Sequence, residues 1–298
     1  MRLFADFTFG PGDACIEGVR WVIATMMSVI ACSGQVDDES RDEQAKLVAR
    51  GVEPPPAPVY AKQEQPIATT RVTHHGGPVL AKMTVRVVHV GDVSEGGASS
   101  AQQAERDALV GFTLTSGAAY WETLAQYGVG PGRLAGAQRI PKALAFAGAM
   151  AAEPLVSVEA LEAQIKLLLH PKSGASIVPP ADAYLFFLPK GTAVSFGNRG
   201  TKVWKSCVDV GAYHRHTGLE PYAVFPPCDL GQSPRAVSHE LAEMATDPVV
   251  GTGWMSDRDQ NVGVGEIADL CNQDVPAPIG GYRLTQLWSN HDGRCVPF

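Results

Sequence analysis

The segment that most constrains the fold is an almost continuous apolar run, Ala183-Tyr-Leu-Phe-Phe-Leu188, which ends at Pro189. A strand with one solvated face alternates apolar and polar residues, so an unbroken run of this length indicates a strand buried on both faces. Such a strand needs one layer of structure above it and another below it. The run therefore predicts a layered domain in which helices pack on a β-sheet.

The segments around this run supply the other elements. Further strands are expected over 84–90, which is rich in β-branched residues, and over 133–140, 222–225 and 283–288. Helices are expected where apolar residues recur at helical spacing: two between 101 and 127 that break near 115–117, one over 158–169, and one from 233 to about 246. Ser157 and Ser233 precede the last two and are typical N-caps. The fold class that follows is α/β (α+β), a single domain with a mixed sheet.

The first 31 residues are typical of an export signal. An apolar run over 21–31 follows Arg20; it has the length of a signal-peptide core and is too short to span a bilayer. Val29-Ile-Ala-Cys32 has the pattern of a lipoprotein cleavage site, at which Cys32 becomes the lipidated N-terminus. The acidic residues within 1–18 do not suit the segment before such a core, so we expect translation to begin at Val19 and residues 1–18 not to be made.

Residues 32–72 are expected to be a disordered tether. They are polar, charged and proline-rich, and they lack the apolar period that would bury enough surface to offset ordering. We therefore expect an exported outer-membrane or cell-surface lipoprotein, whose domain over 73–298 is held at a membrane by a lipid anchor. The net charge of −7 argues against a nucleic acid as a partner.

The chain has six cysteines, of which four fall in the expected domain. Cys15 lies in the segment that is absent from the mature chain, and Cys32 is taken by lipidation. An even number of cysteines in an exported domain predicts disulfides, and the lack of a CxxC pair disfavours a four-cysteine zinc site. Three pairings are open, and the favoured one closes two short loops: Cys207–Cys228 and Cys271–Cys295.

The motif that carries chemistry is Ser238-His-Glu-Leu-Ala-Glu243. On a helix, His239 and Glu243 lie one turn apart on one side, opposite an apolar stripe. This is the spacing of the His-Glu-x-x-His metalloprotease helix, with Glu243 in the place of the second histidine. Two ligands at this spacing hold one metal ion, and Glu240 beside them would act as general base on a metal-bound water.

A third ligand has to come from elsewhere in the chain. Glu266 is the first candidate, with Asp269 as the partner that orients His239. Asp247, two turns after His239, is an alternative ligand, and so is His214, which a strand would place on one face with a second histidine.

Zinc is the expected ion, and calcium is the alternative because carboxylate oxygen also suits a hard cation. Two other interpretations stay open. A histidine and a glutamate on one helix side also occur as ordinary solvated surface. The acidic residues between 257 and 269 would equally suit a structural calcium loop.

Residues 74 to 298 resemble the exported bacterial proteins related to the plant phosphate-induced, EXORDIUM-like family. The motifs that carry the resemblance are His75-Gly-Gly-Pro-Val-Leu80, Tyr222-Ala-Val-Phe-Pro226, Ser238-His-Glu-Leu-Ala-Glu243 and Gly265-Glu-Ile-Ala-Asp-Leu-Cys271. The resemblance implies an exported, zincin-like α/β domain and no particular reaction.

Two functions follow as hypotheses. The first is a surface-tethered, zinc-dependent hydrolase of the metallopeptidase type, with His239, Glu243 and Glu266 as ligands and Glu240 as base. The second is a non-catalytic envelope protein in which zinc or calcium is structural, and which binds a cell-wall polymer or a protein partner. A peptide would be the substrate of the first and a wall polymer the ligand of the second.

Overall fold

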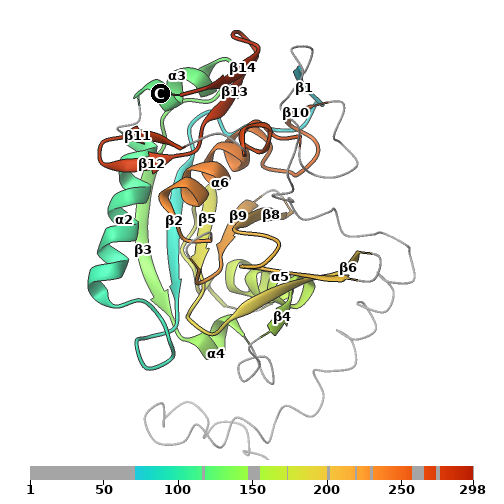
Figure 1. Ribbon diagram of the computed structural model, residues 1–298. Coiled ribbons are helices and arrows are strands. Elements are labelled where there is room, and N and C mark those ends of the chain that lie inside the picture. The colour runs from blue at the N-terminus through green and yellow to red at the C-terminus, as the bar shows by residue number, and fades with distance from the viewer. Residues whose placement is uncertain are drawn as a thin grey trace, which may run out of the picture. The chain divides into compact units, whose positions relative to one another are not determined.

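The apolar run becomes β5 (Ala183–Phe187), the central strand of a five-stranded sheet in the computed structural model (Figure 1). All of its residues are buried, as the sequence predicts for a strand that is covered on both faces. The strands lie in the order β3 (Arg133–Ile140), β2 (Thr84–Val90), β5, β9 (Glu220–Phe225) and β8 (Tyr213–Thr217). The first four are parallel, and β8 pairs antiparallel with β9 at the edge. The predicted α/β class with a mixed sheet is confirmed.

Helices cover both faces of this sheet. One face carries α2 (Ser100–Thr115), α3 (Ala118–Ala125) and α6 (Pro234–Thr246), and the other carries α4 (Lys142–Ala145) and α5 (Val158–Leu169). Successive residues of one strand alternate between the two cores: Leu185 packs in the first and Phe186 in the second. The period of two in a strand thus divides the hydrophobic core into two layers.

The helix starts follow the capping pattern in the sequence. The Ser157 side chain accepts a hydrogen bond from the backbone N–H of Ala160 at 3.2 Å, and the Ser233 side chain accepts one from Ala236 at 3.2 Å. Pro234 occupies the first turn of α6, where its missing N–H costs nothing. Ser233 and Pro234 fix the residue at which α6 begins, and so they determine which side chains of α6 lie on each side of the helix.

The described residues are 71–115, 118–146, 155–172, 174–199, 202–218, 220–228, 231–256, 265–272 and 276–297, and they belong to one compact unit. The expected signal peptide, with Cys32, lies outside them, as does most of the expected tether. The strand β1 (Val72–His74) begins one residue before the expected domain boundary. The acidic residues proposed for a calcium loop at 257–259 also lie outside the described part.

Short strands complete the described part. A three-stranded sheet contains β4 (Leu155–Ser157), β6 (Ala193–Arg199) and β7 (Lys202–Lys205), and three two-stranded sheets pair β1 with β10 (Trp254–Ser256), β11 (Ala277–Ile279) with β12 (Tyr282–Leu284), and β13 (Leu287–Ser289) with β14 (Arg294–Val296). The prediction of one strand over 283–288 is wrong. The chain leaves β12 at Thr285, whose N–H donates to the Ser238 hydroxyl of α6 at 2.8 Å instead of to a strand.

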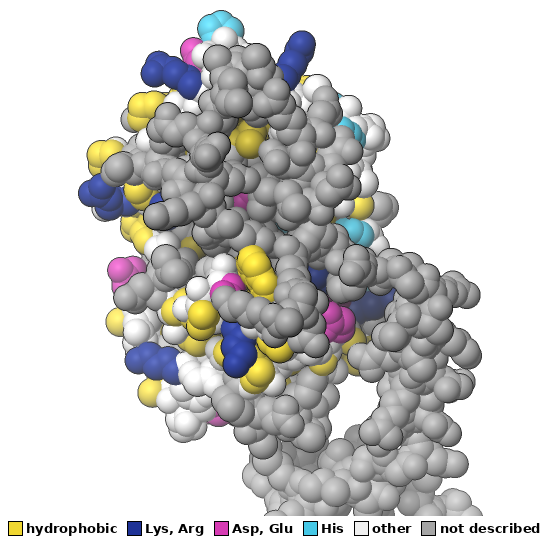
Figure 2. Space-filling view, turned by 45° about the vertical axis from the view of Figure 1, so that its right-hand side comes forward, with side chains coloured by type: hydrophobic (Ala, Val, Ile, Leu, Met, Phe, Trp, Pro, Cys, Tyr) yellow, Lys and Arg dark blue, Asp and Glu magenta, His cyan; other side chains and the backbone are white. Residues whose placement is uncertain are grey.

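Both disulfides form with the pairing that the sequence favoured, Cys207–Cys228 and Cys271–Cys295. Disulfides of this kind persist in oxidising, extracellular surroundings. Among the described helices, none has the length and apolar character that a membrane span needs. On the described part of the face in Figure 2, basic side chains are scattered among hydrophobic and acidic ones.

Candidate metal centre

The helix α6 is buried on every side. Each residue from Ala236 to Thr246 is buried, and His239, Glu240 and Glu243 are all 0% exposed. The apolar stripe of the helix packs in the core against the sheet. Its polar side therefore does not face water, and the interpretation of this side as solvated surface is excluded. Charged groups at such depth need compensating partners.

One group of potential metal ligands consists of His239, Glu243 and Asp269. The His239 Nε2 atom lies 3.0 Å from Glu243 Oε1 and 3.3 Å from Asp269 Oδ1. Asp269 begins the 3₁₀ helix η4 (Asp269–Cys271), and its backbone N–H donates to Glu243 Oε1 at 3.1 Å. One ligand atom from each of the three lies within 4.8 Å of the other two, close enough to hold one ion. The structure thus places Asp269 in contact with His239, the residue that the sequence analysis expects it to orient.

A second group consists of His214, Glu240 and Glu243. His214 Nδ1 lies 3.3 Å from Glu240 Oε2 and 3.5 Å from Glu243 Oε2, and the ligand atoms of the three again fall within 4.8 Å. The strand β8 brings His214 here because its antiparallel pairing sets His214 opposite Ala223 of β9, beside α6. The two groups share Glu243, whose Oε1 atom faces His239 and whose Oε2 atom faces His214.

Glu266 approaches the cluster from the side of His214. Its Oε1 atom lies 3.4 Å from His214 Nε2, and the residue is 2% exposed. It forms a β-bridge with Met255, just before η4. Neither ligand group found in the described part of the chain contains Glu266, so of the expected set only His239 and Glu243 fall in one group, and Asp269 takes the third place there.

Asp247, the alternative ligand, has a different task. Its Oδ1 atom accepts hydrogen bonds from the backbone N–H groups of Thr252 at 3.0 Å and Gly253 at 2.6 Å, and its Oδ2 atom accepts one from Gly251 at 2.6 Å. Three backbone donors use the carboxylate oxygens that a metal would need. Asp247 therefore holds the loop after α6, and in neither ligand group of the described residues does it take part.

Burial makes the carboxyl groups of the cluster hard to ionise. Burial and the nearby charge of Glu243 raise the pKa of Asp269 to about 7, and the same two causes raise the pKa of Glu266 well above its usual range. Burial likewise raises the pKa of Glu240. Glu243 is the exception: burial opposes its ionisation, but the charges and hydrogen bonds of His239 and His214 lower its pKa to about 2.

The two histidines are held towards their charged forms. Burial lowers the pKa of His239 and of His214, but the neighbouring carboxylates outweigh it and raise both well above the usual value. In the metal-free cluster, positive charge on the imidazole rings thus faces the ionised carboxylate of Glu243. A divalent cation would take over this balance and release the protons.

The donor set fits zinc better than calcium. It offers two imidazoles and four carboxylates (Glu240, Glu243, Glu266 and Asp269), and zinc accepts nitrogen and oxygen ligands, whereas calcium prefers oxygen alone. In the described part, the buried atoms Glu240 Oε1 and Asp269 Oδ2 have no hydrogen-bond partner. Buried oxygens that stay unpaired are costly, and coordination to a metal would satisfy them.

Likeness to other proteins adds nothing to this geometry. Comparisons of the chain with protein-family models, with curated proteins and with solved structures found no match.

Proposed function

We propose that this protein is an exported metalloprotein whose buried histidine and carboxylate cluster binds a divalent cation, zinc in the first place. The observation that carries the proposal is the position of Glu243, which is buried and faces His239 with one oxygen and His214 with the other. Four carboxyl groups and two imidazoles buried at this depth lower the stability of the fold unless a cation compensates them.

The closed surroundings favour a metal that supports the fold. The members of the cluster come from four places in the sequence: β8, α6, the bridge at Glu266 and η4. An ion bound by several of them would join the edge of the sheet to the segment that Cys271 and Cys295 close. Structural sites of this type contribute their binding free energy to folding.

Removal of the metal is expected to lower the melting temperature of the domain. A ligand that binds only the folded state at 1,000 times its dissociation constant adds about 4 kcal/mol, so a chelator should cause a large, reversible shift. The measurement is thermal unfolding with and without chelator, followed by addition of zinc or of calcium. Recovery with zinc supports the proposed ion. A melting temperature that neither chelator nor either ion changes would contradict the proposal.

A second candidate, a zinc-dependent hydrolase of the metallopeptidase type, is favoured by Glu240. This residue directly follows His239, belongs to the His214 group and keeps one buried oxygen without a hydrogen bond in the described part. A carboxylate in this position is suited to accept a proton from a water molecule. Zinc, when bound, would act as the Lewis acid, while Glu240 would hold the proton.

Glu240→Gln separates the two candidates. If the protein is a hydrolase of peptides or of a cell-wall polymer, the variant should lose roughly 100-fold or more in turnover while it keeps the wild-type fold. The measurement is the hydrolysis of a peptide library and of isolated wall polymer, with the melting temperature as a folding control. Absence of turnover by the wild-type, metal-loaded protein would exclude the hydrolase.

The proposal includes a location at the cell surface. The two disulfides support export, and the pattern at Val29–Cys32 supports a lipid anchor on Cys32 followed by a tether, with a resemblance to the EXORDIUM-like group of exported proteins. Mass spectrometry of the mature protein should find its first residue to be an acylated Cys32. A precursor that contains residues 1–18 would contradict the expected start at Val19.

A further inference from the structure

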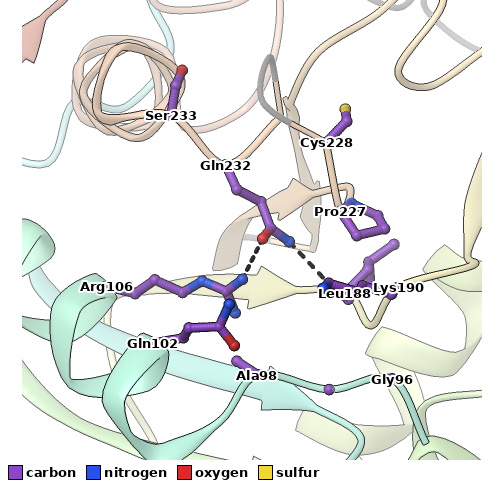
Figure 3. Close-up of a pocket in the computed structure, with 11 residues that line it drawn as sticks. Gly96, Ala98, Gln102, Arg106, Leu188, Lys190, Pro227, Cys228, Gln232 and Ser233 are labelled. Atoms are coloured by element: carbon purple, nitrogen blue, oxygen red, sulfur yellow. Dashed lines mark hydrogen bonds between the residues drawn. The ribbon is translucent and has the colours of Figure 1, made fainter. Parts of the chain in front are cut away.

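A cavity of about 430 Å³ lies away from the metal cluster, at the carboxyl ends of three parallel strands. Its wall is formed by the loop after β2, by Leu188 and Lys190 after β5, and by residues between β9 and α6 (Figure 3). Small-molecule sites typically measure about 300–1,000 Å³, so the cavity has the size of such a site. None of the six residues of the metal cluster lines it.

The cavity lies where the sheet changes its direction of winding. From β2 the chain passes through α2 to β3 on one side, whereas from β5 it proceeds to β9 on the other side. The loops that leave β2 and β5 therefore diverge, and they open a crevice between the two strand ends. In open α/β sheets this is the place where ligands bind.

Two basic side chains give this cavity its charge. Arg106 of α2 and Lys190 both line it, and no acidic residue is among the described residues of its wall (Figure 3). In the described part of the chain, neither Arg106 nor Lys190 forms an ion pair with a carboxylate. Asp107, the neighbour of Arg106, instead pairs with His89 at 2.9 Å. The carboxylates of Glu105 and Asp107 lie near enough to act on the charge of Arg106, but neither forms an ion pair with it in the described part of the chain.

Arg106 is held in a fixed position. Its guanidinium lies over the ring of Phe187, 5.1 Å from the ring centre, and donates a hydrogen bond to the side-chain oxygen of Gln232. Gln232 is itself fixed, because its amide donates to the carbonyl oxygens of Leu188 at 3.2 Å and Phe225 at 3.0 Å. A guanidinium that is positioned in advance loses little freedom when it binds a planar or tetrahedral oxyanion.

We propose that this cavity is a second binding site, which takes a small organic oxyanion through Arg106 and Lys190. The ligand is a molecule of the size of a monosaccharide that carries a phosphate or a carboxylate group. The amide of Gln102, which also lines the cavity, supplies hydrogen bonds to the uncharged part of such a ligand.

The test is calorimetric titration of the full chain at low salt with three probes: glucose 6-phosphate, gluconate and glucose. At least one of the two anionic probes should bind and glucose should not, and the tighter anion shows whether the group is a phosphate or a carboxylate. Arg106→Gln should weaken binding of that anion by about tenfold or more, since a charge-assisted hydrogen bond is lost. Arg133→Gln is the matched control, because it removes the same charge at an exposed position at the start of β3 and should bind as the wild type does.

Lys190→Gln is a second variant for the case in which Arg106→Gln does not fold. Lys190 is exposed, so its substitution should leave the fold intact. It should also weaken the binding of the anion while the melting temperature is unchanged. The proposal is overturned if neither anion binds more tightly than glucose. It is equally overturned if Arg106→Gln and Lys190→Gln both bind the anion as tightly as the wild type does. That result is expected if a metal ion in the cluster, and not this cavity, holds the anion.

Discussion

Glu243→Gln is expected to abolish stable metal binding and to make the melting temperature insensitive to chelator. Glu243 is the one residue that belongs to both ligand groups, and each of its oxygens faces a different histidine. Glutamine keeps the shape of the side chain but removes the charge and one acceptor. Loss of a partner that only orients a ligand costs up to about 100-fold in metal affinity, so loss of a shared ligand should cost at least that much.

The matched control for this prediction is Glu122→Gln, the same chemical change at an exposed position on α3. The control should bind metal and melt like the wild type. Metal binding is measured by titration of the stripped proteins with zinc. If Glu243→Gln binds zinc as tightly as Glu122→Gln does, the cluster on α6 is not the metal site.

The second large effect is a loss of stability of the metal-free protein as the pH rises from 5 to 8. The pKa of Asp269 is raised from 3.8 to about 7, so the folded state keeps a proton that the unfolded chain has already released. This contribution to stability is complete below the unfolded pKa and is lost as the pH rises through the folded pKa. Over the whole interval from pH 3.8 to about 7, a shift of this size in one group corresponds to about 4 kcal/mol, and the rise from pH 5 includes the larger part of it.

The other members of the cluster act in the same direction. Glu240, Glu266, His214 and His239 all have a raised pKa in the folded state, so each also stabilises the fold less as the pH increases. Only Glu243, with a pKa of about 2, acts in the opposite sense, and it does so below pH 4.5. Metal binding needs deprotonated ligands, so the difference in stability between the metal-loaded and metal-free proteins should widen towards pH 8.

Urea unfolding in chelator at pH 5, 6, 7 and 8 measures this effect. Asp269→Asn, which has no titrating group at this position, should show a smaller decline than the wild type. A stability of the metal-free wild type that is constant or rises over this range would show that the carboxyl groups of the cluster are not held protonated.

The sequence predicted most of the elements that build the sheet and α6, because their patterns are local. The apolar run of β5, the β-branched run of β2 and the capping residues Ser157 and Ser233 each act within a few residues. The error over 283–288 arose from a contact far away in the chain, the hydrogen bond from Thr285 to Ser238. A strand that ends because a distant hydroxyl takes its N–H has no local signal.

In the candidate site, too, the sequence predicted the contacts that are local in the chain and not those that depend on distant pairing. The spacing of His239 and Glu243 follows from helix geometry alone, and so does their position opposite the apolar stripe. The central place of His214 depends on the pairing of β8 with β9, a contact that the sequence does not encode locally. The only signal for it was a second histidine two residues later. The side of the cluster from which Glu266 enters depends likewise on its bridge to Met255.

Diffraction at the zinc absorption edge, from crystals of the zinc-loaded protein, tests the central claim most directly. The account predicts an anomalous peak among the side chains of the cluster, within coordination distance of Glu243 and of at least one of His214 and His239, at the roughly 2.0–2.2 Å typical of zinc ligands. A peak only at surface residues, or no peak at all in a crystal that contains zinc, would contradict it.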